Sequence, residues 1–252
     1  GRRADGRLIE EYEFRKLQDE FVERQREHKQ NLIRWRGQLG KARHAESLAA
    51  IEALRDPAAV APIAELMLKE ENREIKLMWI NLLGRIDSSL IVDPLVSIAL
   101  QEANDHVREI ALKTLKDRND PSIQRHFMRH LDPKSNDSLT ISRAGAALGV
   151  LESTEAVRSM IEALVTVHKV ANPAAQNNGR TAAGFNNQQG FSGQFGGGGA
   201  PATVDMPQQN AGVLSGLRTV TGVDYGFDKM RWMQWYASEH TPLGTFDLRR
   251  SD

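Results

Sequence analysis

The feature that most constrains the fold is a repeat of 31–34 residues that runs from about residue 41 to residue 170. Its clearest marks are four equivalent apolar positions, Val60, Val92, Ile123 and Val157. Each opens a segment whose apolar residues recur at helical spacing. A single pair of helices cannot bury its apolar side alone, so a repeat of this length predicts stacked helical pairs.

A second ladder lies in register with the first. Asn72, Asn104 and Asn136 are 32 residues apart, and an apolar residue follows three positions after each of them. Asparagine caps helices well because its side-chain oxygen accepts a free amide of the first turn. Each asparagine is therefore expected to begin the second helix of a pair. The first helices are predicted over residues 58–69, 90–102, 122–130 and 154–169.

These patterns predict an all-α fold, a single right-handed α-solenoid of about five helix pairs, with four segments. Residues 1–40 form a long charged helix that caps one end, and residues 41–170 hold the repeats. Half of the 40 residues in 171–210 are Gly, Asn or Gln. Such a segment buries too little apolar area to offset its ordering entropy, so a disordered insertion is expected. Residues 211–252 hold the last repeat helix and an aromatic cap, and Asn210, which Val213 follows three positions later, is expected to begin that helix as the other asparagines do.

The N-terminal helix is amphipathic. Its apolar stripe runs through Leu17, Phe21, Leu32 and Trp35 at helical steps, with a polar interruption near Gln25. The plain interpretation is a helix that packs its stripe on the next element and leaves a charged face in water. The alternative is a coiled-coil or partner-binding arm, for which only two or three heptads are available.

The sequence holds no recognisable catalytic motif. The chain contains no cysteine, which excludes disulfides, thiolate metal sites and a cysteine nucleophile. Phosphate-binding loops, nucleophile elbows and zinc-binding His pairs of the usual spacing are also missing. His126 and His130 lie four residues apart beside Asp132, but without an assured third ligand we interpret them as a surface pair. We interpret Asp224 and Asp228 as turn and cap residues. The prediction is a protein that is no enzyme and needs no metal or cofactor.

Charge and hydropathy limit the kinds of partner that the chain is expected to bind. Lys plus Arg and Asp plus Glu both number 33, so the formal net charge is zero, which argues against a nucleic-acid partner. No apolar run approaches the roughly 18 residues of a membrane span. The chain begins at Gly1 rather than Met and lacks cysteine, which weakly favours an exported, processed protein. The compartment and the oligomeric state stay open.

Two stretches carry a resemblance to a known family. Asp56-Pro-Ala-Ala-Val-Ala-Pro-Ile and Asn104-Asp-His-Val-Arg-Glu-Ile-Ala-Leu resemble the first and second helices of HEAT repeats. The ending from Thr221, Thr-Gly-Val-Asp-Tyr-Gly-Phe followed by Trp232 and Trp235, is similar to the close of HEAT-repeat proteins of planctomycete-type bacteria. The resemblance implies the solenoid fold and the binding of another macromolecule, and it implies no activity.

Equivalent positions of the second helices define a candidate surface. Lys76 and Arg108 form a basic row, which suits an acidic peptide or a phosphate-bearing partner. These cations would instead be structural if they paired with acidic residues of an adjoining repeat, such as Glu74 or Glu109. The candidate partner-binding residues are Lys76, Trp79, Arg108 and Arg143.

The aromatic tail forms a second candidate surface. Trp232, Trp235 and Tyr236 recur at three- and four-residue spacing on a short helix. We interpret them chiefly as the apolar cap that closes the solenoid, with a ligand-stacking or peptide-binding platform as the alternative.

Together these patterns predict a non-catalytic scaffold or adaptor that binds a protein partner on its second-helix face. One alternative is a self-assembling structural subunit that uses the Phe-bearing insertion. Another is an accessory enzyme of the HEAT-like bilin-lyase type, which would require chromophore binding. A nucleic-acid-binding solenoid is a third alternative, and zero net charge argues against it.

Overall fold

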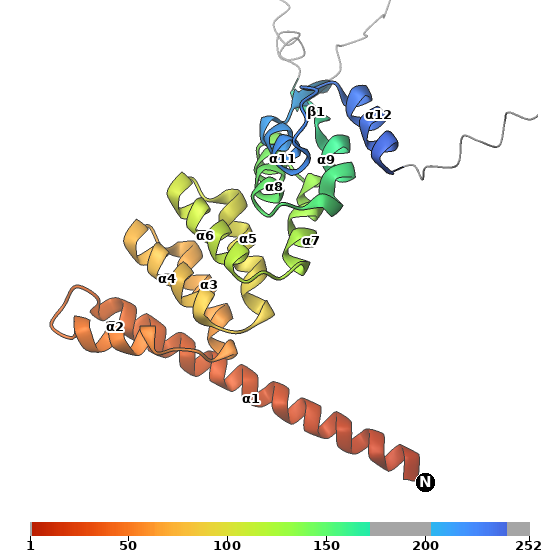
Figure 1. The fold of residues 1–252 in the computed structure, drawn as a ribbon. Helices are drawn as coiled ribbons and strands as arrows, with labels where there is room; N and C mark the ends of the chain where they lie inside the picture. The colour runs from red at the N-terminus through yellow and green to blue at the C-terminus, as the bar shows by residue number, and fades with distance from the viewer. Residues whose placement is uncertain (1, 172–202, 241–252) are drawn as a thin grey trace, which may run out of the picture. The chain divides into compact units, whose positions relative to one another are not determined.

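The computed structural model describes residues 2–171 and 203–240 (Figure 1). Within these ranges the chain is mostly helical, as predicted, with one hairpin of two strands. It divides into two compact units. Unit 1 comprises Gly1–Arg129 and Val150–Ser153, and unit 2 comprises His130–Gly149 and Thr154–Asp252. In the described ranges, no helix combines the length and the apolar character needed to cross a membrane.

Unit 1 contains a long N-terminal helix, as predicted, followed by short helices in pairs. α1 packs against α2, against α3 and against the short turn η1, while α3 packs on α4, α5 on α6, and α4 on α6. The predicted first helices of the repeats correspond to α3, α5 and α7. The helices are α1 (Arg2–Gln38), α2 (His44–Glu52), α3 (Val60–Lys69), α4 (Arg73–Arg85), α5 (Val92–Gln101), α6 (Asp105–Asp117) and α7 (Ser122–Met128), with 3-10 turns η1 (Pro57–Ala59) and η2 (Ser89–Ile91).

The predicted asparagine caps are confirmed in unit 1. The side-chain oxygen of Asn72 accepts the backbone N–H of Ile75, and that of Asn104 accepts the N–H of Val107, both at 3.2 Å. The same polar group therefore starts both second helices, α4 and α6. Fully buried apolar side chains from consecutive pairs fill the core beneath them, among them Leu32, Ile63, Trp79, Leu83, Leu95 and Leu115.

Unit 2 departs from the repeat after its first helices. The helix predicted over residues 154–169 was wrong beyond Ala163, because residues 165–171 form a strand. Three of these seven residues are valines and one is a threonine, and such β-branched residues favour an extended chain. The elements are η3 (Arg129–Leu131), which straddles the boundary between the units, α8 (Ser138–Val150), η4 (Thr154–Ala156), α9 (Val157–Ala163), β1 (Val165–Ala171), β2 (Thr203–Gln209), α11 (Ala211–Thr221) and α12 (Lys229–His240).

The predicted disordered insertion is corrected at its C-terminal end. Residues 203–209 form β2, which pairs antiparallel with β1 from Val165 opposite Gln209 to Ala171 opposite Thr203. The backbone N–H and C=O groups of β2 form hydrogen bonds with β1, which holds the segment in an ordered strand although few of its side chains are apolar. The rest of the expected insertion, residues 172–202, lies outside the described residues.

Two other predicted caps in unit 2 take different roles. α8 begins after Asp137, whose carboxylate accepts the backbone N–H of Thr140 at 2.7 Å, so the cap lies one residue beyond Asn136. Asn210 stands at the start of α11, but its fully buried side chain makes no capping hydrogen bond there. Its side-chain amide donates to the Ala163 carbonyl at 2.7 Å and to the Thr166 hydroxyl at 2.9 Å. Asn210 therefore joins the end of α9 to the hairpin.

Glycines let α8 and α11 approach backbone to backbone. A Cβ atom at Gly212 would lie 2.1 Å from the Ser142 carbonyl oxygen, and one at Gly216 would lie 2.2 Å from the Gly145 carbonyl oxygen. A Cβ at Gly149 would lie 2.6 Å from the Cα of Gly216. These distances are far shorter than van der Waals contact, so only glycine fits at these positions.

Candidate partner-binding surface

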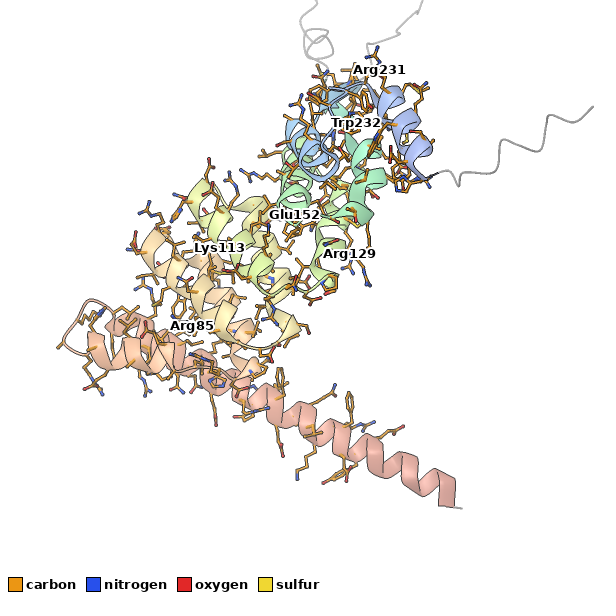
Figure 2. All side chains as sticks on the ribbon, viewed as in Figure 1. Arg85, Lys113, Arg129, Glu152, Arg231 and Trp232 are labelled. Atoms are coloured by element: carbon orange, nitrogen blue, oxygen red, sulfur yellow. The ribbon has the colours of Figure 1, made fainter. Side chains whose placement is uncertain are left out.

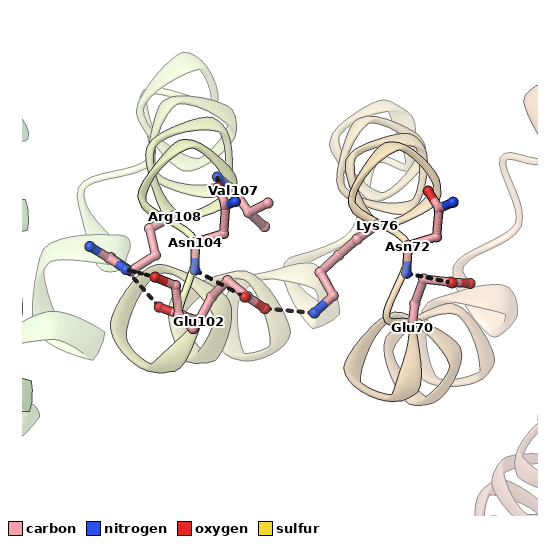
Figure 3. A network of polar contacts seen from close by, with 8 residues as sticks. Glu70, Asn72, Lys76, Glu102, Asn104, Val107 and Arg108 are labelled. Carbon is pink, nitrogen blue, oxygen red and sulfur yellow. Dashed lines mark hydrogen bonds and ion pairs between the residues drawn. The ribbon is translucent and has the colours of Figure 1, made fainter.

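Lys76, the first of the predicted basic residues, lies in the first turn of α4 and is already paired (Figure 3). Its Nζ atom is 2.6 Å from Oε2 of Glu102, and both side chains are about 15% exposed, at 14% and 15%. Glu102 also accepts the backbone N–H of Asn104 at 3.2 Å. Lys76 therefore ties its own helical pair to the loop that precedes α6.

The equivalent glutamate one repeat earlier makes the same contacts. Glu70 accepts the backbone N–H of Asn72 at 3.0 Å, and Arg36 of α1 binds it with two nitrogens, at 2.6 and 2.9 Å. Arg36 thus takes for the first pair the place that Lys76 takes for the next one. Such a two-pronged guanidinium–carboxylate contact is among the stronger polar interactions in proteins.

These contacts shift the pKa values of the acids. Hydrogen bonds from Arg36 hold the pKa of Glu70 below its usual value, and they raise the pKa of Arg36. At Glu102, burial acts to raise the pKa, but the hydrogen bond from Lys76 and those from the backbone outweigh it, so the pKa is lowered. Both glutamates therefore remain charged through the neutral pH range.

Arg108 has no equivalent glutamate to bind, because Lys134 stands at the position 32 residues after Glu102. Its Nη1 atom donates to the carbonyl oxygens of Glu102 at 2.7 Å and Ala103 at 3.0 Å, and Nη2 pairs with Asp105. Both basic residues are thus engaged within unit 1. The partners that the sequence analysis suggested, Glu74 and Glu109, are replaced by Glu102 and Asp105.

The other two predicted residues have different surroundings. Trp79 is fully buried in the core of unit 1, so its ring is removed from any surface of that unit. Trp79 is buried because it lies on the side of α4 that packs inward, together with Ile80 and Leu83. Arg143 is half-buried on α8 in unit 2. There its charge adds to the hydrogen bonds from Thr140 that lower the pKa of Asp137.

The second-helix side of unit 1 is hollowed between α2 and α4. A recess of about 350 Å³ opens there. Half-buried Leu77 and Met78 of α4 line it, as does Arg85, the last residue of α4, which is labelled in Figure 2. The remaining lining residues are Ile51, Glu52, Glu74, Asn81 and Leu82.

The recess follows from the packing of the neighbouring helices. α2 packs on α1, whereas α4 packs on α3 and α6, so α2 and α4 make few contacts with each other. Toward α6, α4 packs closely, because a Cβ at Gly84 would lie 2.6 Å from Thr114 Cγ2. Sequence reasoning missed this site. The available signal was the Leu77-Met78 pair, which falls beside the predicted core face of the helix.

A larger recess of about 460 Å³ lies at the loops that follow α6. Lys116 lines it and ties its walls together, donating to the Val150 carbonyl at 2.7 Å and pairing with Glu152 at 3.1 Å. Most of its other lining residues are polar, among them Asn119, Asp120 and Gln124. These contacts brace the loops that follow α6.

The predicted aromatic surface is centred on a buried residue. Trp232, labelled in Figure 2, is fully buried. Its indole N–H donates to the Gly226 carbonyl at 2.9 Å, and Tyr225 meets its ring edge-on at 5.2 Å. Trp235 and Tyr236 are half-buried. Any platform on this helix is therefore formed by Trp235 and Tyr236, with Trp232 as its support.

The predicted turn and cap roles of the two aspartates are confirmed. Asp224 accepts the backbone N–H of Gly226 at 2.8 Å, and Asp228 accepts that of Arg231 at 3.0 Å. The histidines of the considered metal pair have separate partners. His126 lies 2.7 Å from Asp93, and the described residues contain no group of three side chains that could hold a metal ion.

Comparisons of the chain with models of known protein families, with curated proteins and with solved structures find no match.

Proposed function

We propose that the chain is a non-catalytic scaffold of the HEAT-like α-solenoid type that binds a protein partner on the second-helix side of unit 1. The contacts of unit 1 support the architecture, since α4 packs on α6 and equivalent asparagines cap both helices. Stacks of this kind present extended surfaces built from equivalent helix positions.

The observation that carries the proposal is the recess between α2 and α4. It combines half-buried apolar side chains, Leu77 and Met78, with charged groups of both signs at its margin, such as Glu52 and Arg85. An apolar centre with a polar rim is the usual composition of a protein-binding surface. A short apolar segment of a partner, one or two side chains wide, fits a recess of about 350 Å³.

The buried ion pairs change how the proposal must be tested. Reversing the charge of Lys76 would place two carboxylates together at Glu102 and destabilise unit 1. A loss of binding in such a variant would therefore report on folding. Asn81 is the better position, because it is exposed and lines the recess.

The experiment is affinity capture from a lysate of the source organism, with the intact chain compared with Asn81→Arg. The control is Ser89→Arg, which adds the same side chain at an exposed position on the first-helix side. Circular dichroism verifies that both variants are folded. We expect a protein captured by the intact chain and by Ser89→Arg to be lost from Asn81→Arg. Equal capture by all three would overturn the recess as the binding site.

A further inference from the structure

The N-terminal half of α1 leaves the body of unit 1 as a lone helix. Within the described residues, the ion pairs of α1 with other elements begin at Arg24, whose Nη1 atom is 3.4 Å from Asp56, and continue at His28, Lys29 and Arg36. All side chains from residue 11 to residue 20 are exposed. Figure 2 shows them projecting around the helix with no other element beside them.

This exposed half carries large apolar side chains. Phe14 is 61% exposed, Leu17 64% and Val22 42%, and Phe21 is half-buried, with the Arg24 guanidinium 5.9 Å from its ring centre. We call these four apolar residues the α1 stripe. A contiguous apolar patch of this kind on an exposed helix marks an interaction site.

The α1 stripe continues the face by which α1 packs on unit 1. Phe14, Leu17 and Phe21 follow one another at steps of three and four residues, and the same spacing leads through His28 to Leu32. Leu32 is fully buried against the rest of unit 1. The same face of α1 is therefore buried at Leu32 and exposed at Leu17. This continuity indicates that the exposed part of the face is also an interaction surface.

Acidic residues border the α1 stripe. Glu13 precedes Phe14 and Glu20 precedes Phe21, so both carboxylates stand on the same side of the stripe, about two turns apart. Lys16 lies 3.9 Å from Glu20, but both side chains are more than half exposed, so this pair neutralises little of the charge.

This border distinguishes between possible occupants. In an antiparallel pair with a second copy centred near Leu17, Glu13 of each copy would face Glu20 of the other, and like charges at these positions repel. A helix with lysine or arginine beside its own apolar residues would meet both glutamates with opposite charge.

We propose that the α1 stripe is the docking site for an amphipathic helix of a protein partner whose apolar face is bordered by basic residues. This site is separate from the recess between α2 and α4, and the proposal stands independently of it. Most helical stability in proteins comes from tertiary packing, which the exposed part of α1 lacks, so the bound helix also stabilises this end of α1.

A pair of designed peptides tests the proposal on the full chain. Each peptide is an amphipathic helix of about three heptads with leucine in its apolar stripe, bordered in one by lysine and in the other by glutamate. Fluorescence anisotropy measures their binding. We expect the lysine peptide to bind at least roughly tenfold more tightly than the glutamate peptide, and Glu13→Lys/Glu20→Lys to reverse this preference.

Two further variants separate the stripe from non-specific binding. Leu17→Ser is expected to weaken the lysine peptide roughly tenfold or more, because it removes a buried apolar contact. Tyr12→Ser is the matched control, since Tyr12 is 70% exposed and lies on the opposite side of the helix. Equal weakening by the two variants would contradict the proposal.

Two other results would also overturn it. Sedimentation equilibrium that shows a dimer abolished by Leu17→Ser would identify a second copy as the occupant. Binding of the intact chain to anionic lipid vesicles, lost in Leu17→Ser, would identify a membrane surface.

Discussion

The two units hold their helices together by different means. In unit 1, neighbouring elements are joined by large side chains and by charged groups that reach across, as Arg36 does to Glu70 and Lys76 to Glu102. In unit 2, α8 and α11 touch through glycines, as Gly145 and Gly216 do. The first arrangement tolerates a changed side chain by local adjustment. The second arrangement depends on glycine having no side chain, so almost any substitution at these glycines would make the two helices clash.

The largest effect is therefore expected at a glycine of unit 2. In Gly212→Val, the new Cβ would lie 2.1 Å from the Ser142 carbonyl oxygen, and the backbone on both sides cannot move away without separating the helices. We expect a loss of about 4 kcal/mol or more in the free energy of unfolding of unit 2. Urea denaturation followed by circular dichroism measures this loss.

The matched control is Gly37→Ala in α1, where a Cβ would meet nothing within 4 Å. Alanine is the better helix former, so this variant should gain up to about 1 kcal/mol. If Gly212→Val unfolds at the same urea concentration as the parent chain, the close approach of α8 and α11 is wrong.

The next largest effect is expected at the two fully buried tryptophans, one in each unit. Trp79→Ala and Trp232→Ala should each cost about 3–5 kcal/mol, because each leaves a large cavity in a core. Trp235→Ala, at a half-buried residue, should cost about 1 kcal/mol. Near-ultraviolet circular dichroism and denaturation of the three variants check this order. Equal costs for Trp232 and Trp235 would contradict the burial of Trp232.

A smaller effect is expected from the ion pairs of unit 1. A double-mutant cycle with Lys76→Met and Glu102→Gln should give a coupling energy of about 1–2 kcal/mol, because both groups are largely shielded from water. The same cycle at Arg73 and Glu74, which are 56% and 73% exposed, should give about 0–0.5 kcal/mol. Similar coupling energies for the two pairs would show that shielding from water does not determine the strength of these ion pairs.

The smallest effect is a pH dependence that belongs to unit 1. The pKa values of Glu70 and Glu102 are lowered in the folded chain, so both favour folding above the unfolded value of 4.5. Their contribution is lost as the pH falls from 4.5 through their folded pKa values. We expect Glu70→Gln/Glu102→Gln to flatten the fall in thermal stability below pH 4.5. An unchanged slope would assign the acid lability to other groups.

The sequence predicted unit 1 better than unit 2, and the reason is physical. The caps at Asn72 and Asn104 act within their own helix, so local sequence is enough to place them. The strand that replaces the end of the predicted helix after Ala163 depends on pairing with residues about 40 positions away, which local periodicity does not report. Asn210 likewise matched the cap pattern but serves contacts with Ala163 and Thr166.

The positions of the candidate residues were predicted better than their contacts. The spacing of Lys76 and Arg108 placed both correctly in the first turns of the second helices, but it could not show that Glu102 and Asp105 would engage them. Trp79 was predicted on the surface but is buried, because a shift of one residue around a helix is enough to move a side chain from the surface to the core. The recess between α2 and α4 depends on α2 packing on α1 rather than on α4, and the local sequence of α4 does not show this.

The measurement that most directly tests the proposed binding site is hydrogen–deuterium exchange of the chain alone and with its captured partner. The account predicts that partner binding slows exchange in the amides of α2 and of α4, which border the recess, and leaves α11 and α12 unchanged. Slower exchange confined to residues 11–25 would assign the partner to the α1 stripe instead. Protection confined to α12 would place it on the aromatic surface, and either result would contradict the recess as the site.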